Sequence, residues 1–528
     1  MSKRVLKNLV DLVTGTFVAR ILGFLRELVT AAHYGTHRAM DLFVIAFTIP
    51  TFFRHFLGED VVERAFMPPF KKLISQGKYK SGWRLLSSCL NGMIFVLLTL
   101  LTLLYLIAPL IVKAIAPGLE ADLFPKAITM TYWILPFMFI IGMAAFVGSI
   151  LNFFEMNKIY SLAPAMMSVG VILGILLFRS SLGIYALPAG FLLGGILELL
   201  IQFPFLLKRK ILKDSHAHYY PGIDVKQEDL RTVGRESGFI LLKSLLDKSV
   251  EIVDRMLASY LIAGSIASLW FAQRLIQLPV AIIGLAISRS LIPYLTEKKA
   301  LIKDDEFVDG VHLGIQLNLA LILPTITFMV VMAQPIIAIV YERGSFDAES
   351  TRLTAIAFWC YSVGLLGLSL NAFFSRLFSI FQKNKIPFYI AIFSAAINIL
   401  LNFILVRTAL KHGGIALASS IAFSLSCLLL YYFLKKEVGE KLSTGTVIRD
   451  LLKLGANCLI VGILIYHFFH HVLNPFLEPK FTSLFFQNAM ALLLVAVVTL
   501  LVYMGLIFLW GPENLKRRLV QMIPGVRK

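Results

Sequence analysis

Charged residues interrupt the first two apolar segments of the chain. Arg20 and Arg26 lie in the first segment, and the second contains Asp41, Arg54 and Glu59. A charged group at the centre of a bilayer costs roughly 3 kcal/mol on insertion scales, so such residues face a partner or a water-filled cavity rather than lipid. Because the excess charge is positive, these residues predict binding of an anionic ligand.

The composition predicts the elements that must position these charges. Of the 528 residues, 58% are hydrophobic and only 15% are charged, and the mean hydropathy is +0.80. These values are typical of an all-α polytopic membrane protein and exclude a soluble globular one. Apolar runs of about 20 residues each span a bilayer. They predict fourteen helices, near 8–33, 41–68, 86–112, 125–152, 160–179, 183–207, 236–262, 267–295, 311–341, 354–381, 387–407, 413–434, 449–470 and 486–511.

The formal net charge of +19 follows the topology of these helices. Lysine and arginine concentrate in the N-terminus, the even-numbered loops and the C-terminal tail. This is the positive-inside pattern, which places both termini in the cytoplasm. The charge therefore does not predict a nucleic-acid partner.

An internal repeat divides the chain into two similar halves. The tripeptide Asn157-Lys158-Ile159 recurs as Asn384-Lys385-Ile386, and the basic ends of the sixth and twelfth helices recur near the same offset. Parallel repeats of this kind belong to alternating-access transporters. We expect an N-lobe over 1–207, a cytoplasmic linker over 208–235, a C-lobe over 236–436, and two further helices with a basic tail over 437–528.

No enzyme motif is present in the sequence. It contains no Walker-type loop, no His-Glu-x-x-His and no nucleophile elbow, so we expect a protein that is not an enzyme. The histidines His467, His470 and His471 have helical spacing suited to a metal or to an interfacial aromatic belt, and the belt is favoured. Any pumping must draw on an ion gradient, the membrane potential or substrate flux.

The second half adds its own buried charges. Asp254 and Arg255 lie in the seventh helix, where they fit either an ion pair or a ligand site, and Arg274 lies in the eighth. The intramembrane arginines exceed the acids that neutralise them. Because the guanidinium fork binds phosphate oxygens bidentately and stays protonated, a phosphate or pyrophosphate is the expected counterion.

Several runs of residues resemble one family. They are Ala19-Arg20-Ile-Leu-Gly-Phe-Leu-Arg26-Glu27, Met40-Asp41-Leu-Phe-Val-Ile-Ala-Phe-Thr-Ile-Pro50, Asp254-Arg255-Met-Leu-Ala-Ser259 and Tyr341-Glu-Arg-Gly344-Ser-Phe346-Asp347. Together they look like the signature of the MurJ (MviN) lipid II flippases, and the resemblance covers nearly all predicted helices. It implies the multidrug/oligosaccharidyl-lipid/polysaccharide (MOP) exporter fold, MATE-like, with a V-shaped pair of lobes and a central cationic cavity.

The resemblance also implies roles for individual residues. The required cavity charges of the family fall on Arg20, Arg26, Asp41, Arg54 and Arg274. Glu59 matches an acid that the resemblance associates with gating. Gln273 replaces the acid usual before Arg274, which leaves that arginine less neutralised.

A sodium site is the one cofactor that the resemblance implies. It would map to Asp254, Asn398, Asn402 and Ser419. Asn402 stands where an acid can occur, which lowers the charge of the site. Asn398 and Asn402, four residues apart, share a helix face and fit interhelical hydrogen bonds equally well.

The predicted function is that of a lipid II flippase in peptidoglycan biosynthesis at the bacterial inner membrane. Lipid II would enter from the cytoplasmic leaflet, and alternating access would expose its head group outside. The pyrophosphate would be held by Arg20, Arg26, Arg54, Arg255 and Arg274, with Asp41 orienting or releasing them. The cell-wall synthesis machinery is a candidate partner. The alternatives are a flippase for another polyprenyl-linked glycan and a MATE-like drug or cation antiporter.

Overall fold

The computed structural model describes residues 3–53, 61–206, 218–301, 304–439, 441–477 and 484–522, and every regular element in these ranges is helical. The first part of the chain forms α1 (Lys3–Tyr34), α2 (Arg38–Phe53), α3 (Met67–Ser75), α4 (Tyr79–Ile115), α5 (Phe124–Phe153), α6 (Asn157–Leu182), α7 (Ala186–Leu206) and α9 (Glu228–Ala258). The remainder forms α10 (Ser265–Pro279), α11 (Leu285–Ala300), α12 (Asp304–Val331), α13 (Ala333–Tyr341), α14 (Ala348–Val363), α15 (Leu365–Ile380), α16 (Lys385–Leu405), α17 (His412–Val438), α18 (Thr444–His467), α19 (Asn474–Leu477), α20 (Leu484–Trp510) and α21 (Glu513–Met522).

Many of these helices are long and apolar enough to cross a membrane. Over the described ranges nine qualify by length and composition, or ten if the bent pair α14–α15 forms one span. One of the nine, Asn157–Leu206, has 50 residues. It comprises α6 and α7, which fold back on one another at the turn Gly183–Tyr185, and at 26 and 21 residues each helix is long enough to cross the roughly 30 Å hydrocarbon core. The predicted polytopic helical class is confirmed, and the count of fourteen stays a prediction.

Contacts between residues divide the chain into two compact units. Unit 1 comprises Met1–Ala267 and Arg343–Ser345, and unit 2 comprises Ser268–Glu342 and Phe346–Lys528. Helix α9 therefore packs with unit 1 in this structure. The predicted lobes, linker and terminal segment rest on the sequence repeat, and they stay predictions.

Close helix packing in unit 1 depends on glycine. Gly183, with a φ of +57° that favours glycine, lies in the short 3-10 turn Gly183–Tyr185 between α6 and α7. A Cβ atom at Gly190 of α7 would lie 2.9 Å from Val171 Cα of α6, and Gly170 and Gly194 would collide in the same way. Small residues at such positions let helix backbones approach closely in membranes. Helix α1 packs against α6 of this closely packed pair, and α5 packs against α7.

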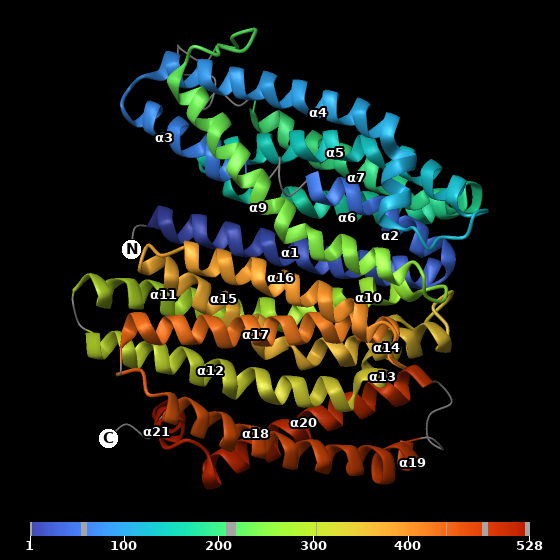
Figure 1. The fold of residues 1–528 in the computed structure, drawn as a ribbon, viewed down its shortest axis with the longest axis vertical. Coiled ribbons are helices and arrows are strands. Elements are labelled where there is room, and N and C mark those ends of the chain that lie inside the picture. Colours follow the sequence, from blue (N-terminus) through green and yellow to red (C-terminus); the bar gives the residue numbers. More distant parts are fainter. Residues whose placement is uncertain are drawn as a thin grey trace. The chain divides into compact units, whose positions relative to one another are not determined.

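The core of unit 2 joins α12 to the helices near the C-terminus. Figure 1 shows α18 and α20, in red, beside α12. Leu319 of α12, Val461 of α18 and Val495 of α20 are almost wholly buried in one apolar cluster. The Tyr503 hydroxyl of α20 donates a 2.9 Å hydrogen bond to the Ala320 carbonyl. The two helices predicted as additions to the repeat are thus part of the core of unit 2.

Candidate functional site

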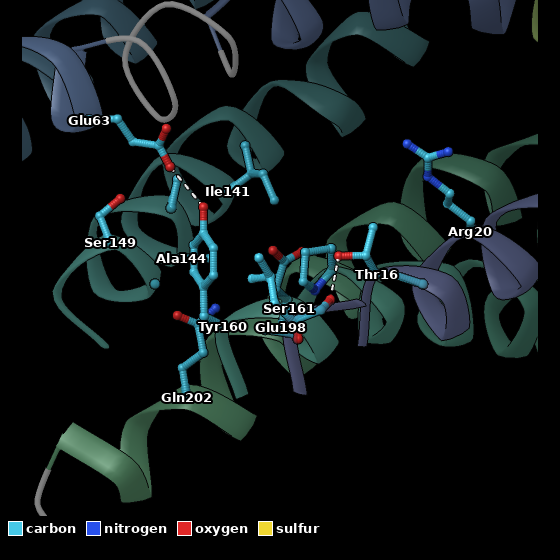
Figure 2. Close-up of a pocket in the computed structure, with 16 residues that line it drawn as sticks. Thr16, Arg20, Glu63, Ile141, Ala144, Ser149, Tyr160, Ser161, Glu198 and Gln202 are labelled. Atoms are coloured by element: carbon cyan, nitrogen blue, oxygen red, sulfur yellow. Dashed lines mark hydrogen bonds between the residues drawn. The ribbon is translucent and has the colours of Figure 1, made fainter. Parts of the chain in front are cut away.

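A cavity of about 460 Å³ lies within unit 1, lined by α1, α5, α6, α7 and Glu63. Thr16 and Arg20 of α1 line it together because residues four apart share a helix face. Arg20 is exposed, and it forms no hydrogen bond or ion pair with any residue in the described ranges. Figure 2 shows its guanidinium apart from the Glu63–Tyr160 pair. This arginine can therefore bind an external anion.

The remaining polar lining of the cavity is rich in oxygen. The Tyr160 hydroxyl donates a 2.7 Å hydrogen bond to Glu63 (Figure 2). Glu198 and Gln202 of α7 and Ser149 of α5 also line the cavity, and all three are buried. The sequence analysis missed Glu198 and Gln202, although a lone acid inside the apolar segment Gly194–Ile201 was a signal that could have revealed them.

Arg26, one turn and a half further along α1, has partners inside unit 1. Its guanidinium lies 2.7 Å from the carboxylate of Glu27 and 5.5 Å from the ring centroid of Phe191. Only 12% of the Arg26 side chain is exposed. A cation over an aromatic face and beside a carboxylate is already stabilised. Arg26 should therefore gain less than Arg20 from binding an anionic ligand.

Arg255 is more deeply buried than Arg20 or Arg26. Its guanidinium donates to the Thr48 hydroxyl and to the Glu251 carboxylate. Glu251 also accepts a 2.8 Å bond from Lys248, and Asp254 lies next to Arg255 in α9, half-buried. The ion-pair alternative raised by the sequence thus applies to Arg255, with Glu251 as its partner.

Asp41 binds backbone amides. Its carboxylate accepts hydrogen bonds from Gly264 N at 2.7 Å and from Ala267 N at 2.8 Å. Gly264 has a φ of +85°, a conformation that glycine adopts without strain. Because Ala267 lies in the first turn of α10, the carboxylate stabilises buried amides at a helix N-terminus that have no acceptor within the helix.

The other predicted site residues fall elsewhere. Arg54 and Glu59 lie outside the described residues. Arg274 belongs to unit 2, where its guanidinium lies 4.0 Å from the ring centroid of Trp270. The roles predicted for these three residues stay predictions.

The residues of the expected sodium site are divided between the units. Asp254 belongs to unit 1, and the other three residues belong to unit 2. There Asn402 donates to Asn398 Oδ1 at 2.8 Å, and Asn398 donates to Ser419 Oγ at 3.0 Å. This chain of hydrogen bonds links α16 to α17 and uses two of the oxygens that would bind a cation. Sodium binding stays a prediction.

Comparisons with known proteins now decide the family. The model of the family "Lipid II flippase MurJ" matches residues 30–487 of this chain. The chain belongs to the MurJ family. Lipid II flippase MurJ from Burkholderia cenocepacia is 26% identical over 462 residues, which cover 85% of this chain and 87% of that protein.

Solved structures support the fold of this MurJ family member. A structure titled as lipid II flippase MurJ in an inward closed conformation matches with a TM-score of 0.77 and 24% identity, covering 96% of this chain and 99% of that one. An inward-facing multidrug resistance MATE family transporter of the MOP superfamily matches with a TM-score of 0.58 and 16% identity, covering 84% and 96%. The predicted MATE-like fold is confirmed.

Proposed function

We propose that this protein is a lipid II flippase and not an enzyme. It would carry the undecaprenyl-pyrophosphate-linked peptidoglycan precursor from the cytoplasmic to the outer leaflet of the bacterial inner membrane by alternating access. Both termini would lie in the cytoplasm. Membership of the MurJ family and the likeness to an inward closed MurJ structure support the proposal.

The observation that carries the binding step is the state of Arg20. This side chain is exposed at a cavity and has no partner among the described residues, whereas Arg26 and Arg255 each contact a carboxylate. An arginine without an internal acid can give its full fork of donors to a pyrophosphate. We therefore assign Arg20 the first contact with the anionic head group.

The remaining arginines would act after this first contact. Arg26 and Arg255 would bind the pyrophosphate only by exchanging their carboxylate partners for it, so their contribution depends on a change of arrangement. Arg54 and Arg274 would complete the anion site. The membrane potential assists, because an anion that leaves a negative interior gains about 2.3 kcal/mol per charge per 100 mV.

The test uses cells depleted of this protein and complemented with wild type, Arg20→Ala or Arg20→Lys. The matched control is Arg352→Ala, which removes an exposed arginine paired with Glu349 on α14. The measurement is the fraction of the lipid-linked precursor that is accessible from outside the cell.

We expect depletion to abolish outward exposure of the precursor. Wild type and Arg352→Ala would restore it fully, Arg20→Lys in part, and Arg20→Ala least at equal protein abundance. Full rescue by Arg20→Ala would contradict the role of Arg20. Unchanged exposure after depletion would contradict the lipid II assignment and favour another polyprenyl-linked glycan or drug export.

A further inference from the structure

Helix α7 places two polar side chains inside the cavity of unit 1. Glu198 and Gln202 are 6% and 1% exposed, and Ser149 of α5, also lining the cavity, is 5% exposed. The spacing of four residues puts Glu198 and Gln202 on one face of α7. Burial of an amide in an apolar helix is unfavourable unless its polar atoms have partners, so the buried Gln202 needs a physical reason.

Gln202 places a buried hydrogen-bond acceptor at the cavity. Its Oε1 atom is fully buried and accepts no hydrogen bond from any residue in the described part of the chain. A Cβ atom at Gly148 of α5 would lie 3.2 Å from this oxygen, so the glycine leaves room for it. A buried acceptor without a donor costs about 1–3 kcal/mol. A donor or a cation in the cavity would recover that energy.

The charges around the cavity favour a positive group. Its lining contains two carboxylates, Glu63 and Glu198, and one guanidinium, Arg20. Arg20 forms no ion pair with either acid, and the Tyr160 hydroxyl already donates to Glu63. One carboxylate with neutral amide and hydroxyl oxygens suits a hard cation of low charge. No group of three His, Cys, Asp or Glu that could hold a transition metal occurs in the residues that the structure describes.

We propose that Glu198, Gln202 and Ser149 form a binding site for a small positively charged group. The group is an inorganic monovalent cation or the ammonium of an organic ligand, since both offer positive charge to oxygen acceptors. The site lies wholly within unit 1 and differs from the expected sodium site of Asp254, Asn398, Asn402 and Ser419. It does not depend on the identity of the transported lipid.

The experiment measures thermal unfolding of the purified full-length protein in detergent, without lipid substrate. NaCl, KCl or methylammonium chloride is titrated against tetraethylammonium chloride at constant ionic strength, because the bulky cation has no N–H donor. The site variants are Glu198→Gln, Gln202→Leu and Ser149→Ala. Glu349→Gln is the matched control for loss of an exposed carboxylate, and Asn398→Ala separates the expected sodium site.

We expect a saturable rise in the unfolding midpoint of the wild type. Glu198→Gln should raise the half-maximal cation concentration at least about tenfold, Gln202→Leu and Ser149→Ala should raise it less, and both control variants should respond as the wild type does. A response to Na⁺ or K⁺ supports an inorganic ligand, and a response to methylammonium alone supports an organic ammonium.

Two results would overturn the proposal. One is the absence of a saturable response to all three cations. The other is an unchanged half-maximal concentration in Glu198→Gln. The conservative Glu198→Gln change keeps the shape of the side chain, so a folded protein is expected even if Gln202→Leu fails to fold. A failed flippase assay would leave this result untouched, because no lipid enters the measurement.

Discussion

Replacing Arg20 with alanine should weaken anion binding and leave stability almost unchanged, whereas Arg255→Ala should clearly reduce stability. Arg20 is exposed and has no partner among the described residues. Hydrogen bonds to a charged group contribute about 1.5–3 kcal/mol, and about 1.4 kcal/mol corresponds to a factor of ten. Loss of the guanidinium should therefore weaken pyrophosphate binding roughly ten- to 150-fold. Removal of an exposed side chain without partners changes stability by about 0.5 kcal/mol or less.

Arg255 differs because it is buried against Thr48 and Glu251. Breaking a buried pair leaves a carboxylate in an apolar site at a cost of about 3–5 kcal/mol. The Glu251 side chain is 27% exposed and keeps its bond to Lys248, so the expected loss of stability falls to about 2 kcal/mol.

The assay has two parts. Native mass spectrometry of the solubilised protein, titrated with undecaprenyl pyrophosphate, gives the affinity, and thermal unfolding without ligand gives the stability. Equal affinities for Arg20→Ala and wild type would refute the reasoning about Arg20. A loss of stability in Arg20→Ala as large as that in Arg255→Ala would show that Arg20 has a structural partner and would refute it equally.

Three further predictions concern packing and hydrogen bonding, and thermal unfolding checks each of them. Gly194→Ala should destabilise the protein by about 1–3 kcal/mol, because the new Cβ atom would collide with the backbone of α6. The control Gly455→Ala should not destabilise it, because no neighbouring atom lies within 4 Å of the new Cβ. Equal losses of stability in the two variants would contradict the packing argument. Asp41→Asn should cost about 1–3 kcal/mol, because one of the two backbone amides loses its acceptor, and a variant as stable as wild type would show that these bonds contribute little. Asn398→Ala should reduce stability by roughly 1 kcal/mol, because it removes the hydrogen bonds of Asn398 to Ser419 and Asn402. An unchanged stability would show that the bond between α16 and α17 contributes little.

Much of the fold could be predicted because every backbone N–H and C=O group inside a bilayer must be hydrogen-bonded within the protein. An apolar chain therefore crosses the bilayer as helices long enough to span it. Long apolar runs such as Phe485–Trp510 correspond directly to helices. The sequence was less informative about where each helix begins and ends and about which helices pack together. The placement of α9 with unit 1 depends on packing between helices distant in sequence, which neither hydropathy nor the internal repeat reports.

The candidate site was only partly accessible from the sequence. The charge of Arg20 predicted that it avoids lipid, and Arg20 lines a cavity within unit 1, whereas its place in a central anion-binding cavity stays a prediction. The difference between Arg20 and Arg255 was not predictable, because it depends on whether Thr48 and Glu251 lie within reach of each guanidinium. Gln202 was missed because a single amide in an apolar helix gives a weak signal until burial and unsatisfied hydrogen bonding are known.

The most direct test of the central claim is translocation by the purified protein in proteoliposomes. Labelled lipid II is introduced into both leaflets, a membrane-impermeant reagent modifies the outer pool, and the rate at which the inner pool becomes accessible is measured under an imposed potential. We expect wild type and Arg352→Ala to transfer the lipid at similar rates and Arg20→Ala to transfer it at least about tenfold more slowly. Transfer by wild type no faster than in protein-free liposomes, or equal transfer by Arg20→Ala, would contradict the account.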